Sequence, residues 1–271
     1  FKMTPKKTVK ECGCTYLYGV CMKVAQGALE ISKCPHMSDE ALAELSEATA
    51  PPMKTIKVGA GENEYSLGGE TVLFRHEKTF VSKTRYAVSL CTCMDDAAVD
   101  AKLAEIQKVD YDRIGERMHV EMIYVNYEDG ADKDRYVEMV KKAAALGRTL
   151  ILGCKDVEVA KAALEVCKDG KPVLNGATAA NYAAMSEVAT AAGVVLGVAG
   201  ADLNETYDTV AALEKAGNKN LVIDATGTSV KEAYANAVQI RRASVKDQDR
   251  TFGYPTIVNV AALAHGDRTL Q

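Results

Sequence analysis

The chain has 271 residues, of which 48% are hydrophobic, so it can bury one large core beside a small module. Its 33 basic and 37 acidic side chains leave a formal net charge of −4, which excludes the excess of Lys and Arg that nucleic acid binding requires. The longest apolar run, residues 193–201, is too short to cross a bilayer, and no secretory signal pattern opens the chain. These features predict a cytoplasmic protein with no nucleic acid and no membrane partner.

Cysteines crowd the amino-terminal end of the chain, at Cys12, Cys14, Cys21 and Cys34, and Pro35 follows the last of them. Four thiolates can hold a 4Fe–4S cluster, and a run that closes on Cys-Pro is one form of such a site. In a cytosolic protein, clustered cysteines favour metal ligands over disulfides. We therefore predict that these four cysteines bind an iron–sulfur cluster, although one residue rather than two separates the first pair.

A change of pattern near residue 50 divides the chain. A short acidic helix is expected over residues 38–49, with Ser38 as its N-cap, and Pro51-Pro52 ends it. The predicted domains are a cysteine-rich iron–sulfur domain with its linker helix, residues 1–52, and a larger domain, residues 53–271.

The larger domain opens on two extended segments, 55–58 and 71–74, which are separated by glycine turns and predict a hairpin. After residue 85, apolar runs typical of strands alternate with segments of helical periodicity. The expected strands are 86–91, 119–125, 149–154, 172–177, 194–199, 221–225 and 256–261. The expected helices are 97–108, 133–146, 157–167, 180–192, 204–216 and 230–242.

Continuous apolar strands joined by helices indicate an α/β fold with a parallel sheet. The number of units favours a TIM-type (βα)8 barrel over an open doubly wound sheet. Seven strands are visible rather than eight, so the barrel is predicted to be incomplete at its C-terminal end. Either the chain is a fragment of a longer protein, or a partner covers the open seam.

Candidate functional residues follow the carboxyl ends of the strands, where such sheets place their active loops. They are Thr92, Cys93, Asn126, Lys155, Asp156, Thr178, Gly200, Asp202, Thr226, Gly227 and His265. The sharpest single candidate is Asp224, because a carboxylate inside an apolar strand needs a partner or a role. Its structural alternatives are a cap on the next turn and an ion pair with Arg241 or Arg242.

The other cysteines and the histidines favour structural roles. Cys91 and Cys93 have strand spacing, so their side chains are predicted to point to one side of the sheet and to be buried as small hydrophobes. Cys154 and Cys167 are also predicted to lie in the core. The four histidines lack a zinc-binding spacing, and no dinucleotide or P-loop motif is complete.

Ordered sequence blocks along the chain match one known family. They are Lys6-Lys7, Glu11-Cys12-Gly13, Met22-Lys23-Val24-Ala25-Gln26-Gly27, Cys34-Pro35, Ala50-Pro51-Pro52, Leu73-Phe74-Arg75-His76, Ala179-Ala180-Asn181-Tyr182, Gln239-Ile240-Arg241-Arg242 and Phe252-Gly253-Tyr254-Pro255. Over essentially all of its length the chain resembles the large (gamma) subunit of the corrinoid iron–sulfur protein of the acetyl-CoA decarbonylase/synthase system, in the reductive acetyl-CoA pathway.

The resemblance implies a methyl carrier component rather than a free-standing enzyme. Such a carrier takes a methyl group from a methyltetrahydrofolate or methyltetrahydropterin methyltransferase and delivers it to acetyl-CoA synthase, while the cluster supplies electrons for the reductive reactivation of cobalt. The implied cofactors are a 4Fe–4S cluster and a corrinoid (cobalamin). The implied partners are the small (delta) subunit in a heterodimer, the methyltransferase, and acetyl-CoA synthase/CO dehydrogenase.

The chain departs from the family's cysteine pattern. Laid ungapped on this chain, that pattern falls on Val9, Cys12, Leu17 and Cys34. Only Cys12 and Cys34 therefore carry over, and Cys14 and Cys21 would have to complete the ligand set. Cys21 lies one helical turn beyond Leu17 if this segment is a helix, which makes a displaced ligand geometrically feasible.

The family's C-terminal cobalamin-binding domain has no counterpart in this chain, so the corrinoid is expected at a partner interface or on a part of the protein outside it. Asn175, Asn181 and Asp224 are the barrel residues that would face the corrinoid or the small subunit. Two alternatives stay open. One is a pterin-binding methyltransferase barrel, in which an Asp and Asn pair on neighbouring strands is expected and Asp224 with Asn175 would imitate it. The other is a metal-free structural interaction subunit.

Overall fold

The computed structural model describes Ser38, residues 51–74, His76 and residues 81–264. From Pro52 onward, the described residues belong to one compact unit, Pro52–Gln271. The four amino-terminal cysteines and the predicted helix 38–49 lie outside the described residues, apart from Ser38. The iron–sulfur module and the division of the chain near residue 52 therefore stay predictions.

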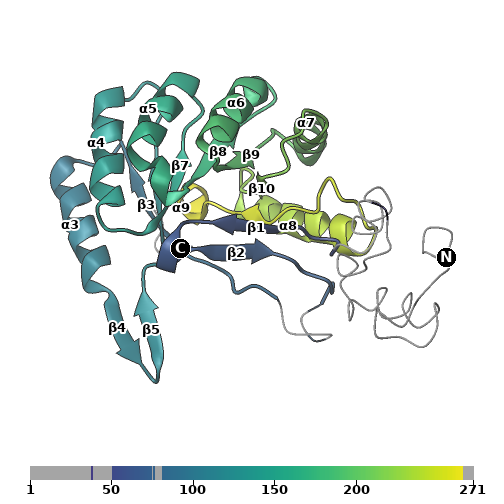
Figure 1. The fold of residues 1–271 in the computed structure, drawn as a ribbon, viewed down its shortest axis with the longest axis horizontal. Helices are drawn as coiled ribbons and strands as arrows, with labels where there is room; N and C mark the ends of the chain where they lie inside the picture. Colours follow the sequence, from purple (N-terminus) through teal and green to yellow (C-terminus); the bar gives the residue numbers. More distant parts are fainter. Residues whose placement is uncertain (1–37, 39–50, 75, 77–80, 265–271) are drawn as a thin grey trace. The chain divides into compact units, whose positions relative to one another are not determined.

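A curled sheet of seven parallel strands forms the centre of the described unit (Figure 1). Its strands are β3 (Ala87–Cys91), β6 (Met122–Asn126), β7 (Thr149–Gly153), β8 (Val173–Ala177), β9 (Val195–Val198), β10 (Leu221–Asp224) and β11 (Thr256–Ile257). The order across the sheet, β11-β10-β9-β8-β7-β6-β3, follows the order along the chain. This order is that of a barrel, whereas a doubly wound sheet reverses direction at a switch point. A strand forms at each of the seven predicted places, although the last is much shorter than predicted, and an eighth is absent from the part that the structure describes.

In the described unit, a long helix follows each of the first six strands of this sheet along the chain. These helices are α3 (Asp96–Lys108), α4 (Lys133–Ala144), α5 (Val157–Cys167), α6 (Tyr182–Ala192), α7 (Leu203–Lys215) and α8 (Val230–Val245). Side-chain caps fix where the helices begin. The Asp156 side chain accepts hydrogen bonds from two backbone N–H groups at the start of α5, and the Asp202 side chain accepts one from a backbone N–H at the start of α7. Gly193 ends α6 in the left-handed conformation (φ +66°), which costs a glycine little.

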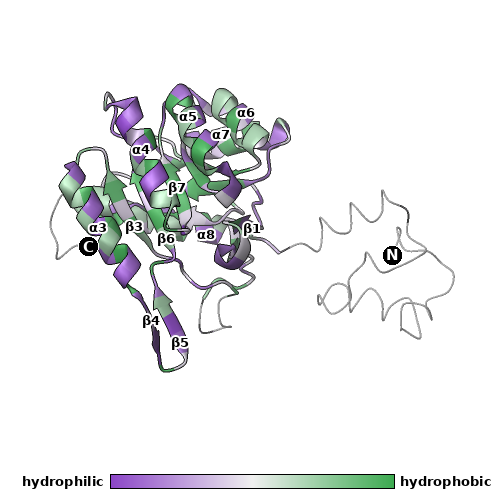
Figure 2. Cartoon of the chain, turned by 60° about the vertical axis from the view of Figure 1, so that its left-hand side comes forward, coloured by the Kyte–Doolittle hydropathy of each residue, from purple (hydrophilic) through white to green (hydrophobic). Residues whose placement is uncertain are grey.

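The core lies between the sheet and the inward faces of the helices. Every residue of β7 is buried. The central strands are mainly hydrophobic, whereas polar residues lie on the outer faces of α3 and α4 (Figure 2). Tyr136 of α4 is fully buried, and its hydroxyl donates to the carbonyl oxygen of Val125 over 3.2 Å, so this polar atom is satisfied. None of the described helices is long and apolar enough to span a membrane.

A two-stranded hairpin precedes the sheet, and its second strand differs from the prediction. Strand β1 (Thr55–Val58) pairs antiparallel with β2 (Tyr65–Gly68), and a short 3-10 turn, Gly61–Asn63, lies between them. The segment 71–74, predicted as the second strand, is a loop. The carbonyl oxygens of Val72 and Leu73 instead accept hydrogen bonds from Arg241 of α8.

The hairpin covers the amino-terminal end of the sheet. The Gly59 N–H donates to the Lys171 carbonyl (3.0 Å), and the Asn63 amide donates to the Gly147 carbonyl (2.7 Å), just before β8 and β7. The Lys54 N–H donates to the Gly253 carbonyl (2.7 Å), just before β11. Side chains reinforce this last link, because Lys54 forms an ion pair with Glu214, to which the Tyr254 hydroxyl also donates (2.7 Å).

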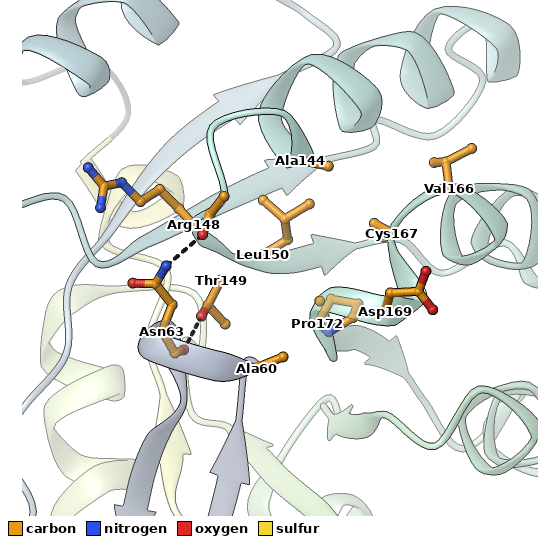
Figure 3. A pocket seen from close by; sticks show the side chains of 12 residues that line it. Ala60, Asn63, Ala144, Arg148, Thr149, Leu150, Val166, Cys167, Asp169 and Pro172 are labelled. Atoms are coloured by element: carbon orange, nitrogen blue, oxygen red, sulfur yellow. Dashed lines mark hydrogen bonds between the residues drawn. The ribbon is translucent and has the colours of Figure 1, made fainter.

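A pocket of about 230 Å³ lies beside this hairpin, at the amino-terminal end of the sheet (Figure 3). Its lining residues are Ala60, Asn63, Ala144, Gly147, Arg148, Thr149, Leu150, Val166, Cys167, Asp169, Gly170 and Pro172. None of the candidates predicted at the ends of the strands is among them, since those that belong to the described residues lie at the opposite, carboxyl end. The pocket therefore follows from the docking of the hairpin and supports no catalytic role.

Two further elements differ from the prediction. A second hairpin, β4 (Asp110–Arg113) with β5 (Glu116–His119), leads into β6, and His119, predicted to start that strand, belongs to this hairpin. Near the end of the described residues, β11 is only two residues long. The helix α9 (Val260–Ala264) begins where the strand was expected to continue.

Candidate functional site

A polar cluster lies at the carboxyl end of the sheet, around the strongest sequence candidate. Asn175 on β8 donates its amide hydrogen to Asp224 at the end of β10 over 2.7 Å. The other carboxylate oxygen of Asp224 accepts from the backbone N–H of Thr226 (3.0 Å) and from the Thr226 hydroxyl. Asp224 and Asn175, the acid and amide of the pterin-binding alternative, are therefore in contact, but they lie on alternate strands with β9 between them rather than on neighbouring strands.

Glycines on the intervening strands make this contact possible. Gly197 lies on β9, between the strands of Asn175 and Asp224, and a Cβ atom there would clash with the Asn175 side chain. Gly153 on β7 has the same role for Tyr124 of β6, whose hydroxyl occupies the space that a side chain would need. Because these two glycines have no side chains, the polar side chains of Asn175 and Tyr124 can lie over the neighbouring strands β9 and β7.

The cluster contains an unpartnered acceptor. Asn175 is only 4% exposed, and its side-chain oxygen, which is buried, has no hydrogen-bond partner. Burial raises the pKa of the nearby Tyr124 phenol, and interaction with the Asn175 side chain opposes this rise only in part, so Tyr124 is a neutral hydroxyl at physiological pH. Asp224, Asn175 and Tyr124 together can bind a ligand with N–H donors, but they do not resemble a nucleophile and base pair.

The structural alternative for Asp224 is also partly confirmed. The carboxylate caps the turn after β10 through Thr226, as predicted. The predicted partner Arg241 lies elsewhere, 3.8 Å from the carboxylate of Glu70. Asn181, the third barrel candidate, links loops, because its amide donates to the carbonyl of Lys155 (2.7 Å) and its oxygen accepts from the Thr178 N–H (2.6 Å).

The prediction that Cys91 and Cys93 are buried as small hydrophobes is wrong. Cys91 is half-buried, Cys93 is exposed, and their sulfur atoms are joined as a disulfide at the end of β3. The period-2 argument fails because the strand ends at Cys91, so Cys93 lies in the following turn rather than on the pleated sheet. The carboxylate of Glu128, which the sequence did not single out, lies 3.8 Å from the Cys91 sulfur.

The other cysteine prediction is confirmed. Cys154 and Cys167 are free and buried. Burial raises the pKa of the Cys154 thiol to about 11 and that of Cys167 to about 12, so both are neutral, unreactive thiols. The histidines show no zinc grouping in the described residues: His76 stacks on Phe74, and the Nε2 atom of His119 lies 3.3 Å from the Tyr65 hydroxyl.

Consecutive parallel strands with a polar cluster at their carboxyl ends define an α/β protein of the TIM-barrel type. Residues 55–270 match the model of the family described as CO dehydrogenase/acetyl-CoA synthase delta subunit. The chain belongs to this family. The resemblance predicted from the ordered sequence blocks is confirmed by two curated relatives.

The chain is 34% identical, over its full length, to the corrinoid/iron–sulfur protein large subunit of Moorella thermoacetica, of which it covers 61%. It is 30% identical to the acetyl-CoA decarbonylase/synthase complex subunit gamma of Archaeoglobus fulgidus, where the match covers 98% of this chain and 60% of that protein. The chain thus spans about three fifths of the length of these relatives.

Solved structures show the same fold at much lower identity. Dihydropteroate synthase from Thermus thermophilus is 15% identical, with a TM-score of 0.52, and the match covers 78% of this chain and 81% of that one. The complex of that enzyme with 6HMPPP gives a TM-score of 0.51 over 79% and 80% of the two chains. At this identity the likeness establishes the barrel-type fold and nothing about the ligand.

Proposed function

We propose that this chain is the barrel-bearing part of the large subunit of a corrinoid iron–sulfur methyl carrier, acting within an acetyl-CoA decarbonylase/synthase system. The observation that carries the proposal is the 34% identity to a corrinoid/iron–sulfur protein large subunit across the whole chain. Its physical tasks are to position partners and to relay electrons, rather than to break bonds itself. The absence of a nucleophile and base pair from the described polar cluster agrees with this division of labour.

The proposal assigns the electron relay to the amino-terminal cysteines, Cys12, Cys14, Cys21 and Cys34, as ligands of a 4Fe–4S cluster. A cluster bound there would supply single electrons that return oxidised cobalt to its active state. The proposed methyl donor is a methyltetrahydrofolate or methyltetrahydropterin methyltransferase, and the acceptor is acetyl-CoA synthase. The small subunit is the proposed partner that helps to enclose the corrinoid.

Anaerobically purified protein is expected to contain about four irons and four acid-labile sulfides per chain. Iron and sulfide analysis with electron paramagnetic resonance of the reduced protein measures this directly. Changing Cys12 or Cys34 to serine is expected to remove most of the iron. Cys167→Ala, which alters a buried thiol in the barrel, should leave the iron content unchanged. Fewer than about two irons per chain would contradict the cluster and favour a metal-free interaction subunit.

A second candidate function, a pterin-binding methyltransferase barrel, is favoured by one observation. Asn175 and Asp224 meet at the carboxyl end of the sheet, and the buried oxygen of Asn175 lacks a donor, while pterin rings carry N–H groups. The carboxylate of Asp224, however, is already bonded on both oxygens within the protein. This makes it a weaker ligand for an incoming ring.

Titration of the full chain with methyltetrahydrofolate separates the two functions. The carrier function predicts no tight binding by this chain alone, because the methyltransferase partner holds the pterin. Micromolar binding by isothermal calorimetry, lost in Asn175→Ala and kept in Asp208→Ala on the exposed face of α7, would overturn the carrier proposal in favour of the methyltransferase.

A further inference from the structure

Two thiols and a carboxylate meet at the carboxyl end of β3, apart from the Asn175–Asp224 cluster. Cys91 and Cys93 contribute their sulfur atoms, and Glu128 contributes a carboxylate oxygen from the loop after β6. One ligand atom from each residue lies within 4.8 Å of the others. Sulfur and carboxylate groups are donors that divalent metal ions accept, and thiolates select the thiophilic ones.

Hydrogen bonds hold the two loops in this arrangement without help from a ligand. The Thr92 N–H donates to the Asn126 carbonyl (3.1 Å), and the Glu128 N–H donates to the Thr92 hydroxyl (3.0 Å). Arg135 of α4 donates to the carbonyls of Thr92 (2.9 Å) and Met94, so its guanidinium fixes the turn that carries Cys93. Thr92 itself is only 4% exposed. A binding site whose supporting contacts are already made loses little ordering entropy when it binds its ligand.

Donors also point at the first sulfur atom. The backbone N–H of Cys93 donates to the Cys91 sulfur over 3.2 Å, and the side-chain amide of Asn126 lies 3.8 Å from it on the donor side. Hydrogen bonds of this kind stabilise a thiolate, which is the form that binds metal. The same contacts recur as outer-shell support in metal sites, where they orient the ligands.

The disulfide by itself would stabilise the fold only slightly. The bridge joins residues that are two apart, and the entropy that a disulfide removes from the unfolded chain falls as the closed loop shortens. Cys93 is exposed, so reductants can reach the bridge. A carboxylate beside two sulfurs adds nothing to a structural disulfide, but it completes a ligand set.

We propose that Cys91, Cys93 and Glu128, once the disulfide is reduced, bind one thiophilic divalent cation of the Zn²⁺ class. A dithiol reductant reduces the disulfide to two thiols by giving up two electrons and two protons, and becomes a disulfide itself. With a phosphine, the phosphine supplies the two electrons, water supplies the two protons, and the water oxygen leaves as phosphine oxide. Binding of the cation then displaces the two thiol protons to solvent and forms two metal–sulfur bonds and one metal–oxygen bond. Three protein ligands leave a fourth tetrahedral position open for water or an external ligand.

Cobalt(II) is the probe that tests the site, because cobalt bound to thiolate has a charge-transfer band that zinc lacks. The test protein is the full chain with Cys12, Cys14, Cys21 and Cys34 changed to serine, which removes the other candidate metal ligands. After reduction with a phosphine, this variant is expected to bind one equivalent of cobalt with a thiolate band, and zinc should displace the cobalt. The proton released on binding can be followed in weakly buffered solution.

Matched variants make the result specific. In the same background, Cys93→Ser should abolish the thiolate band. Glu128→Gln should weaken cobalt binding by more than the roughly 10- to 100-fold that loss of an outer-shell partner costs. Cys167→Ala, a buried thiol with a raised pKa, should change neither quantity. Circular dichroism of each variant checks that the fold is kept.

Three results would overturn this site. They are the absence of a thiolate band in the reduced variant, a band that survives Cys93→Ser, and a disulfide that resists the phosphine in thiol titrations of the folded protein. None of these outcomes depends on iron in the amino-terminal module. The cation site and the proposed carrier function can therefore fail separately.

Discussion

Replacing Asp224 by alanine is expected to lower the free energy of unfolding by about 3 kcal/mol, because it leaves several polar groups without a partner. The Asn175 amide, the Thr226 N–H and the Thr226 hydroxyl all donate to this one carboxylate. Thr226 also accepts from the Asn259 N–H (2.9 Å), so the loss spreads to the segment after β11. Denaturant unfolding followed by circular dichroism measures the change in free energy.

Two further substitutions make the Asp224 experiment decisive. Asp224→Asn is expected to cost only about 1 kcal/mol, because its oxygen still accepts from Thr226 and the Asn175 amide can rotate to present its free oxygen to the new NH₂ group. Asp208→Ala on the exposed face of α7 should change stability by less than about 0.5 kcal/mol. If Asp224→Ala were as stable as Asp208→Ala, water would be replacing the carboxylate, and the cluster would be hydrated rather than closed.

Gly176→Ala is expected to destabilise the protein by roughly 3 kcal/mol or more, since the new side chain meets backbone that cannot move aside. Gly176 has φ +155°, and a Cβ atom there would overlap the carbonyl oxygen of Cys154, which directly follows the neighbouring strand β7. The residue also lies at the register shift of β8, between Asn175 and Ala177. Alanine at this position would therefore displace Asn175 from its contact with Asp224.

Gly170→Ala is the control for Gly176→Ala. Nothing lies within 4 Å of a Cβ atom at Gly170, and its φ is not positive, so alanine should be neutral or stabilising by a few tenths of a kcal/mol, up to about 1 kcal/mol. Thermal and denaturant unfolding of the two variants should differ by several kcal/mol. Equal stability would mean that the bulge in β8 is not required for the fold.

Local chemistry explains why most of the fold could be predicted from the sequence. The bounds of α5 match the prediction at both ends, because Asp156 caps its start and its apolar positions repeat with helical period. The hairpin β4–β5 was missed because its strands are polar and exposed. It is held by ion pairs of Asp110 with Arg117 (2.6 Å) and Arg148 (3.0 Å), of which Arg148 comes from a distant segment. Those two arginines lower the pKa of the Asp110 carboxyl well below its usual range.

The predicted partner strand of β1 was wrong for a similar reason. The segment 71–74 has higher strand propensity, but the register is set by contacts of the turn with the sheet, where the Thr149 hydroxyl donates to the Asn63 carbonyl (2.7 Å). Tyr65, two residues after Asn63, therefore begins the paired strand. Propensity alone carries no information about such a contact.

The two groupings at the carboxyl end of the sheet differ in how far they could be predicted. Asp224 ends β10 and Asn175 lies two residues before the end of β8, and parallel strands bring their carboxyl ends to one edge, so their meeting follows from the sequence pattern. The grouping of Cys91, Cys93 and Glu128 depends on where β3 stops and on loop contacts through Thr92. A Cys-x-Cys pair that straddles the end of a predicted strand is the only signal for it, and Glu128 gives none.

The anchoring of Lys54 to Gly253 has a kinetic consequence. The hydrogen bond between them, and the stacking of the Lys54 ammonium 3.8 Å from the centre of the Tyr254 ring, join residues about two hundred positions apart along the chain. During synthesis, the first hairpin emerges from the ribosome long before its docking site exists. Final closure of the domain must therefore wait until β11 has been made, and such distant pairing slows folding.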